Sequence, residues 1–190
     1  MARLTYWMNV SLDLSIEHTA GEQGGGSWMR IGEPLHREFN RRARGLVAFV
    51  QGRTIFETME GFWPAARSDA SLPDYLQEYG RIWTETPKIL VSSTRTAAPY
   101  DTRVVASIDA LAEVCAALDG PVGVGGATVA TQLLERGLLD ELVLFLHPVV
   151  LGSGRPLFDR MPAPVECDLL EHAAFDGGVT LQRYAIRKAV

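Results

Sequence analysis

The sequence has few cysteines, no long apolar run and no signal-peptide pattern, and each of these absences excludes a class of protein. Only two of the 190 residues are cysteines. Cys115 and Cys167 lie far apart and form neither a disulfide framework nor a metal-ligand spacing. No apolar run approaches the roughly 18 residues of a membrane span. The N-terminal stretch lacks a long apolar core and a small-residue cleavage site, so we expect a cytoplasmic chain.

Several catalytic and binding classes are also missing from the sequence. It contains no G-x-x-x-x-G-K-[ST] phosphate loop, no H-E-x-x-H and no G-x-S-x-G. The four histidines do not cluster, so we expect no metal site. The net charge of −5 gives no electrostatic support for nucleic-acid binding. The arginines at 37–44 are typical of the solvated face of a helix.

What the sequence does contain is a regular alternation of short apolar runs and helical patterns. This alternation predicts one domain over 1–190 with a mostly parallel sheet covered on both faces, and antiparallel strands at one edge. A long connection at 13–34 follows the first strand, and Asp176-Gly177 predicts a two-residue hairpin. The expected strands are 3–12, 46–50, 88–92, 103–107, 121–124, 140–152, 165–175 and 178–189. The expected helices are 33–44, 53–62, 74–86, 108–120 and 127–137.

Small and polar residues follow several of the predicted strands, at the edge of the sheet where parallel strands usually place ligands. Gly125-Gly126 precedes a helix whose first N–H groups could meet an anion. Gly52-Arg53-Thr54 repeats that arrangement, and Ser92–Arg95 adds hydroxyls and a guanidinium. Each of these stretches alone could be turn chemistry. Together they favour an extended, phosphorylated cofactor.

Four segments then indicate a family. The segment "VGVGGATVATQLLERGLLDELVLFLHPVVLGSGRPLF" (122–158) resembles the C-terminal half of the dihydrofolate-reductase-like superfamily. The likeness is greatest to the branch of the riboflavin-biosynthesis reductase domain and its stand-alone relatives. "NVSLD" (9–13) is similar to that branch's S-L-D-G motif, and "VQGRTIFETM" (50–59) to the G-R-x-T-x-E segment of dihydrofolate reductases. "ILVSSTR" (89–95) is similar to the next cofactor strand of those enzymes.

The resemblance implies a three-layer α/β/α fold with a mostly parallel sheet and a C-terminal antiparallel hairpin. It also implies an NADPH-dependent reductase. The expected cofactor-binding residues are Gly52, Arg53, Thr54, Ser92, Ser93, Thr94, Arg95, Val124, Gly125, Gly126, Ala127, Thr128 and Val129. Asp13 is followed by Leu14 where the branch has glycine, and Ile55 stands where threonine is usual.

The long connection supplies the candidate catalytic and substrate residues. Asp13 and Glu17 could orient or protonate a substrate nitrogen. Trp28 could stack on a ring, and either Glu33 or His36 could take the place of the carboxylate that holds a pterin. The alternative is structural, with Asp13 capping the loop, Glu17 solvated and Trp28 packed on the core.

The sequence therefore predicts hydride transfer from NADPH to a small heterocycle, either pterin- or dihydrofolate-like or 5-amino-6-(ribosylamino)uracil phosphate-like. A non-catalytic dinucleotide-binding or sensor module is the alternative. No membrane or nucleic-acid partner is expected. The apolar run in 141–158 predicts a homodimer with this segment and the hairpin at the interface, unless the chain's own layers bury that run.

Overall fold

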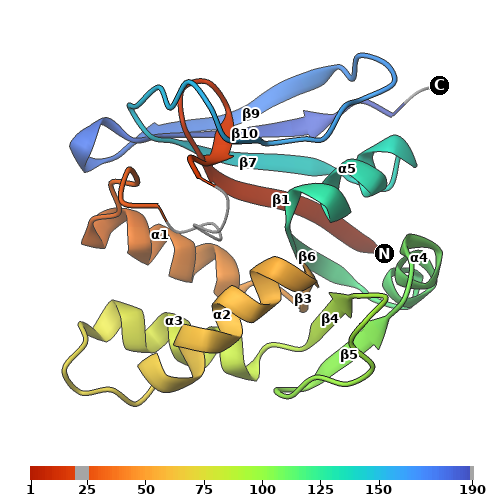
Figure 1. Cartoon of the computed structure of the whole chain (residues 1–190), viewed down its shortest axis with the longest axis horizontal. Coiled ribbons are helices and arrows are strands. Elements are labelled where there is room, and N and C mark those ends of the chain that lie inside the picture. The colour runs from red at the N-terminus through yellow and green to blue at the C-terminus, as the bar shows by residue number, and fades with distance from the viewer. Residues whose placement is uncertain (20–25, 189–190) are drawn as a thin grey trace.

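A computed structural model describes residues 1–19 and 26–188, and it is organised around one eight-stranded sheet (Figure 1). The sheet order is β5-β4-β3-β6-β1-β7-β10-β9, and a separate small sheet pairs β2 with β8. Strands β5 to β7 in this order are parallel, whereas β10 runs antiparallel to both β7 and β9. The strands are β1 (Ala2–Val10), β2 (Ser15–Glu17), β3 (Ala48–Gly52), β4 (Lys88–Val91), β5 (Thr102–Val105), β6 (Gly120–Gly125), β7 (Glu141–Leu146), β8 (Arg155–Pro156), β9 (Cys167–Ala174) and β10 (Thr180–Ile186).

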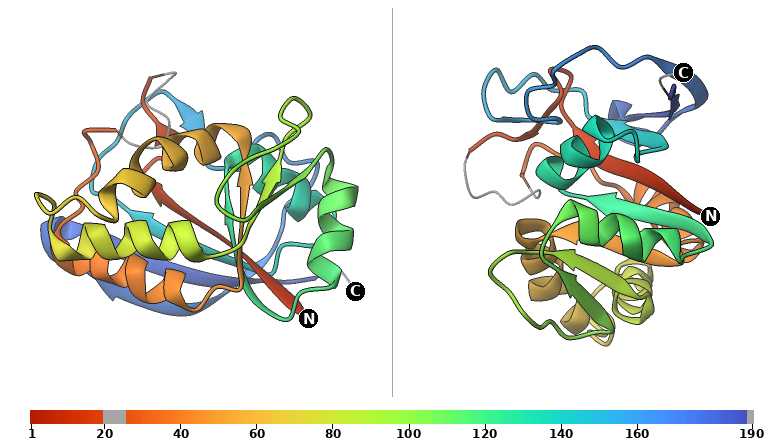
Figure 2. Two further views of the ribbon diagram at one scale, coloured as in Figure 1. Left: turned by 90° about the horizontal axis from the view of Figure 1, so that it is seen from below. Right: turned by 90° about the vertical axis from the view of Figure 1, so that its right-hand side faces the viewer.

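Helices cover both faces of this sheet, as the two views in Figure 2 show. The helices are α1 (Glu33–Arg44), α2 (Arg53–Ala66), α3 (Asp74–Glu85), α4 (Ile108–Ala116) and α5 (Ala127–Glu135). Successive strand residues point to opposite faces, so each inner strand supplies apolar side chains to both layers. Val50 and Ile89 pack with α4 and α5, whereas Phe49 and Leu90 pack with α1, α2 and α3. The predicted three-layer α/β/α fold is confirmed.

Some boundaries differ from the prediction for local reasons. The helix predicted at 108–120 ends at Ala116, and Gly120 instead begins β6 with φ +130°. The predicted helix 53–62 continues to Ala66 with Pro64 inside it. The hairpin predicted at Asp176-Gly177 is confirmed, since β9 and β10 pair antiparallel, but its turn is longer than two residues. The turn is a short 3₁₀ segment, Asp176–Gly178, in which both glycines have positive φ.

The long connection at 13–34 contains a strand that the sequence did not reveal. Ser15–Glu17 forms β2 and pairs with β8, which brings the connection against the loop after β7. The two segments approach closely, because a Cβ added to Gly154 would collide with the carbonyl oxygen of Glu17. Residues 20–25 of this connection, and residue 189 of the last predicted strand, lie outside the described residues.

The apolar run at 141–146 is buried by the chain itself. Strand β7 lies between β1 and β10, and Val143 and Phe145 are 2% and 1% exposed beneath α1. The strand ends at Leu146, well short of the predicted 152. The apolar character of this run therefore reflects its central place in the sheet, as the intramolecular alternative predicted, and gives no evidence for a partner chain.

Candidate functional site

Two glycine-capped helices begin side by side at the carboxyl edge of the sheet. Gly52 is the N-cap of α2 and Gly126 is the N-cap of α5, and neither helix has a side-chain cap. These turns are close, since a Cβ added to Gly126 would lie 3.6 Å from the backbone nitrogen of Gly52. Gly126 has φ +101°, a conformation that side-chain-bearing residues rarely adopt. The arrangement leaves two helix N-termini open toward one place.

Helix α4 shows what the other two lack. The Ser107 hydroxyl accepts a hydrogen bond from the backbone N–H of Ala110, which satisfies one donor of the first turn of α4. The first turns of α2 and α5 have no such acceptor from their N-cap residues, because both are glycine. Unsatisfied N–H groups and the positive end of a helix dipole favour an anion. The donor set fits the diphosphate of a dinucleotide.

The polar residues predicted beside this anion site take different positions. The Arg53 side chain is about half exposed, and its ion pair with Glu57 is loose at 3.7 Å. Arg95 is tied down more firmly, with Nη1 donating to Glu60 Oε2 at 2.9 Å and its guanidinium 5.1 Å from the Phe56 ring centroid. Of the two arginines, Arg53 is therefore the freer to meet a phosphate.

The hydroxyl residues after β4 also differ in whether they are buried or exposed. Ser92 is buried, and its Oγ accepts the backbone N–H groups of Thr94 and Arg95. That hydroxyl closes the turn. Ser93 and Thr94 are exposed at the surface of the same turn.

Arg155 is a further cation at this edge, and the sequence reasoning did not select it. Its Nη2 donates to the Thr128 hydroxyl at 2.7 Å, which places the guanidinium at the first turn of α5. The signal available in the sequence was only the loop "GSGR" at 152–155. Its proximity to α5 depends on the pairing of β8 with β2.

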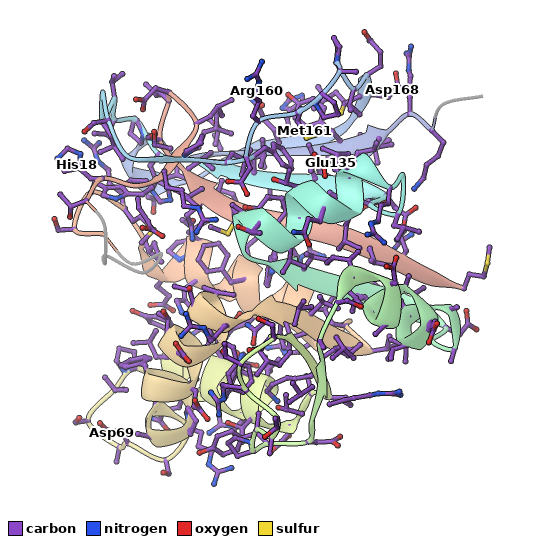
Figure 3. All side chains as sticks on the ribbon, turned by 45° about the vertical axis from the view of Figure 1, so that its right-hand side comes forward. His18, Asp69, Glu135, Arg160, Met161 and Asp168 are labelled. Carbon is purple, nitrogen blue, oxygen red and sulfur yellow. The ribbon has the colours of Figure 1, made fainter. Side chains whose placement is uncertain are left out.

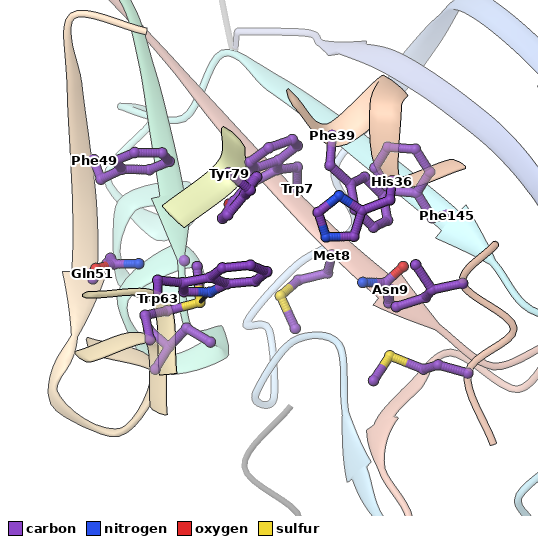
Figure 4. A pocket seen from close by; sticks show the side chains of 15 residues that line it. Trp7, Met8, Asn9, His36, Phe39, Phe49, Gln51, Trp63, Tyr79 and Phe145 are labelled. Atoms are coloured by element: carbon purple, nitrogen blue, oxygen red, sulfur yellow. Dashed lines mark hydrogen bonds between the residues drawn. The ribbon is translucent and has the colours of Figure 1, made fainter. Parts of the chain in front are cut away.

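A pocket of about 210 Å³ opens next to these helix ends, with Ile55 of α2 and Gly125 of β6 in its wall (Figure 4). Six aromatic side chains and three methionines form most of its lining. The polar side chains of the lining include those of Asn9, His36 and Gln51. Among the described residues, no aspartate, glutamate, lysine or arginine lines it. The complete lining is Trp7, Met8, Asn9, Met29, Ile31, His36, Phe39, Phe49, Gln51, Ile55, Met59, Trp63, Tyr79, Gly125 and Phe145.

Asn9 is held in one orientation by a buried histidine. The backbone N–H of Arg30 donates to His147 Nδ1 at 2.9 Å, which leaves the proton of the neutral ring on Nε2. His147 Nε2 lies 2.9 Å from Asn9 Oδ1, so the ring donates and the amide oxygen accepts. Burial lowers the pKa of His147 to about 4, which keeps it neutral above that pH. The Asn9 nitrogen consequently faces the pocket, as Figure 4 shows.

The predicted substrate residues are only partly brought together. His36 lines the pocket, and burial lowers its pKa, opposed by Asn40 and Glu78. Trp28 does not line the pocket but packs edge-on against His147, with ring centroids 5.6 Å apart. Glu33 lies outside and accepts a hydrogen bond from Arg37 at 2.8 Å. Of the two candidates for the pterin-binding position, only His36 reaches the site.

Asp13 and Glu17, the predicted proton donors, are not in the described pocket lining. Asp13 accepts hydrogen bonds from the Ser11 hydroxyl and from the backbone N–H groups of Leu151 and Gly152. These hydrogen bonds, the Ser11 hydroxyl foremost, lower the Asp13 pKa to about 2. Its carboxylate thereby joins the loops that follow β1 and β7. A proton-donor role for Asp13 or Glu17 stays a prediction.

No metal cluster competes with this interpretation in the part of the chain that the structure describes. No group of three or more His, Cys, Asp or Glu side chains there could hold a metal ion. Within the same residues, no helix combines the length and apolar character needed to span a bilayer.

Comparisons with known proteins agree with this architecture. Residues 120–181 match the RibD C-terminal domain family. The whole fold is similar to a putative riboflavin biosynthesis protein from Shewanella sp. PV-4, at a TM-score of 0.73 and 19% identity over 98% of this chain and 99% of that one. The chain has the dihydrofolate-reductase-like fold. The resemblance predicted from the sequence is confirmed.

Two further solved structures share the dihydrofolate-reductase-like fold with this chain. A pyrimidine reductase-like protein from Corynebacterium diphtheriae matches at a TM-score of 0.63 and 16% identity, over 98% of this chain and 92% of that one. Dihydrofolate reductase from Enterococcus faecalis, in complex with NADP(H) and RAB-propyl, matches at a TM-score of 0.63 and 14% identity, over 98% and 97% of the two chains. These likenesses show the fold.

One curated relative matches over a shorter stretch. The uncharacterized protein YyaP of Bacillus subtilis is 40% identical over 55 residues, which is 29% of this chain and 29% of YyaP. The family match over 120–181 and the dihydrofolate-reductase-like fold of the whole chain thus agree with each other.

Proposed function

We propose that this protein is an NADPH-dependent reductase that transfers a hydride to a small heterocyclic substrate. The observation that carries the proposal is that the apolar pocket begins where the open N-termini of α2 and α5 meet. Ile55 and Gly125 belong to both features. A dinucleotide whose diphosphate lies at the helix ends can extend its nicotinamide into the pocket.

The chain's own residues would divide the binding of this cofactor between them. Backbone groups of Gly52 and of Gly125 to Val129 would meet the diphosphate, because no side chain caps those helices. Arg53, together with Ser93, Thr94 and Arg95, would surround the adenosine ribose and its 2′-phosphate. Arg155 would add positive charge beside Thr128.

The pocket would then exclude water and orient the substrate. When bound, the reduced nicotinamide supplies the hydride. Aromatic walls such as Trp7 and Trp63 suit the faces of a flat ring. Burial raises the pKa of Tyr79, so its phenol stays protonated at neutral pH and could donate a hydrogen bond to the substrate. We expect protonation of the product from within this pocket or from solvent at its mouth.

The test is NADPH consumption by the full chain with a panel of reducible heterocycles, alongside direct titration of NADPH. Micromolar NADPH binding with turnover of at least one pterin or pyrimidine supports the reductase. NADPH binding without turnover on any compound would favour the non-catalytic dinucleotide-binding module. Absence of NADPH binding contradicts both.

We also propose that the protein forms a homodimer, now on different evidence from the apolar β7 run. Leu169 and Leu170 on the edge strand β9 are 54% and 50% exposed, and Val165 just before it is 40% exposed. An apolar edge strand is a favourable surface for pairing with a second copy. Light scattering at micromolar concentration should give twice the 20.8 kDa of one chain. A single-chain mass that does not change on tenfold concentration would contradict it.

A further inference from the structure

The lining of the pocket restricts the substrate further than the family and fold do. Resting on the proposed function, we infer that the substrate is a flat, uncharged heterocycle larger than one six-membered ring, with a carbonyl oxygen bound by the Asn9 amide nitrogen. The site would reject rings that carry a positive charge and would give no anchor to a phosphate inside the pocket.

The charge of the lining restricts the ligand. A protonated ring needs a carboxylate beside it, and no described acidic side chain lines the pocket. The nearest sequence candidate, Glu33, is exposed and engaged by Arg37. Likewise, no described lysine or arginine is present in the lining to pair with a phosphate. Aromatic faces can attract a cation, but the N–H groups of a protonated ring would find no carboxylate acceptor in the described lining, so neutral ligands are favoured.

The Asn9 amide has a fixed orientation toward the pocket. An asparagine amide usually can present either its oxygen or its nitrogen to a ligand. Here the Asn9 oxygen is already taken by His147, whose tautomer is fixed by the Arg30 backbone N–H. Turning the amide over would place its NH₂ against the Nε2–H of His147, donor against donor. Asn9 therefore offers only N–H groups to the pocket, and the ligand atom that it meets must be an acceptor such as a carbonyl oxygen.

The spacing of two amides restricts the size of the ligand. Gln51 is 3% exposed, and its Oε1 is buried without a hydrogen-bond partner. Strand β6 lies between β1, which carries Asn9, and β3, which carries Gln51, so the two amides stand on opposite sides of the pocket (Figure 4). A single six-membered ring does not span two strand spacings of about 4.8 Å each. A two-ring ligand with polar atoms at both ends could satisfy both amides.

A matched pair of probes tests this inference: a quinazolinone, which is neutral with a ring carbonyl, and the diaminoquinazoline of the same size, which is protonated at neutral pH. Binding is measured through the tryptophan fluorescence of the full chain, with and without NADPH. We expect the quinazolinone to bind at least about tenfold more tightly. Equal binding, or tighter binding of the diamino compound, would overturn the inference. Glu22 lies in residues 20–25, outside the described part of the chain, so Glu22→Gln is measured too. Binding of the diamino compound that depends on the Glu22 carboxylate would also overturn the inference.

Variants of Asn9 then test the donor. Asn9→Leu should weaken quinazolinone binding by about tenfold, as expected for a lost hydrogen bond that leaves a buried carbonyl. Asn9→Asp should reverse the preference, since its second oxygen would face the pocket as a charged acceptor. Gln182→Leu, remote on β10, should change neither. If Asn9→Leu lowers NADPH affinity and leaves quinazolinone binding intact, Asn9 serves the nicotinamide and the inference fails.

His147 acts through Asn9 and is a positioning residue. His147→Phe frees the Asn9 amide, so the ratio of quinazolinone to diaminoquinazoline affinity should fall while NADPH affinity stays the same. His147→Gln, which can accept from Arg30 and donate to Asn9, should restore the ratio. An unchanged ratio in His147→Phe contradicts the orientation argument. Probe affinity is measured independently of turnover, so a protein that prefers the quinazolinone but oxidises NADPH with no compound of the panel refutes the proposed function and leaves this inference standing.

Discussion

The proposed cofactor edge, formed by the N-termini of α2 and α5, adjoins the apolar pocket at Ile55 and Gly125, yet the two are built in opposite ways. The edge relies on backbone: glycines at 52 and 126, open helix N-termini and few committed side chains. The pocket relies on side chains contributed by β1, β3, β7 and the three helices α1, α2 and α3. A backbone site needs only glycine and the start of a helix, so sequence can reveal it. A side-chain site depends on which residues meet across the fold, and sequence reveals little of that.

The largest loss of NADPH affinity is expected when a negative charge is added to the site built from backbone. Gly52→Asp places a carboxylate where the diphosphate is proposed to lie, and two like charges about 4 Å apart repel by roughly 4 kcal/mol. We expect NADPH affinity to fall by about three orders of magnitude. Stability should change by only about 1 kcal/mol, because aspartate is itself a good N-cap, which offsets the small shift that Val129 Cγ2 must make for a Cβ 3.3 Å away.

The matched control for this change is Gly61→Asp, the same substitution at an exposed glycine two turns further along α2, where an added Cβ would meet nothing within 4 Å. It should leave NADPH affinity unchanged. Isothermal titration with NADPH measures both variants. If both lose affinity equally, or if Gly52→Asp binds normally, the diphosphate does not lie between α2 and α5.

The second prediction concerns the buried histidine of the pocket. Because the His147 pKa is about 4 in the folded chain and about 6.5 when unfolded, the unfolded chain binds more protons between those values. The free energy of unfolding should therefore fall as pH drops from 6.5 to 4, by about 3 kcal/mol from this group. Urea titrations across this range measure the slope.

Substitution separates His147 from the other groups that titrate there. His147→Gln keeps both hydrogen bonds without a titrating ring, so the slope should flatten. The pKa of His36 is lowered as well, so some pH dependence of the same sign should remain. His172→Gln, on the exposed face of β9, is the control and should keep the wild-type slope. A wild-type slope in His147→Gln would contradict the lowered pKa.

The third prediction concerns the two arginines at the proposed cofactor edge. Arg53 is exposed and loosely paired, so we expect Arg53→Ala to weaken NADPH binding by about 1–3 kcal/mol and NADH binding much less. Arg95→Ala should have the smaller effect, because Arg95 is already engaged by Glu60. Arg67→Ala, at the other end of α2, is the control. Equal losses for both cofactors would mean that Arg53 meets the diphosphate.

The smallest effect is expected at Asp13. With three hydrogen bonds and a pKa near 2, its carboxylate anchors a loop and is ionised at neutral pH. Asp13→Asn keeps one acceptor oxygen, for the Ser11 hydroxyl and the Leu151 N–H, and loses the hydrogen bond from the Gly152 N–H. Because this change affects the loop and not a proton donor, turnover should stay within about twofold of wild type. Asp69→Asn, in the loop between α2 and α3 that Figure 3 labels, is the control. A loss of turnover in Asp13→Asn alone, with NADPH affinity preserved, would support the proton-donor role predicted from the sequence.

Much of the fold was accessible from local patterns. The helix at 33–44 was predicted at its observed bounds, because Glu33-Pro34 begins it and its apolar spacing is regular. The order of strands and helices also emerged, since each short apolar run is a strand covered on both faces. Strands β2 and β8 could not be predicted. They are three and two residues long and exist because the two loops meet.

The sequence by itself determined the alternating layers and the backbone-built cofactor edge, because glycine and helix-start signals are local. Only the tertiary structure decided the pocket. Asn9 and His147 are 138 positions apart, and their hydrogen bond depends on β1 pairing with β7. The tertiary structure also placed His36, and not Glu33 of the same helix, in the pocket lining, because the rotation of α1 on the sheet sets which side chain is buried. Residues distant in sequence become one site only when packing brings them together, and no local pattern encodes that.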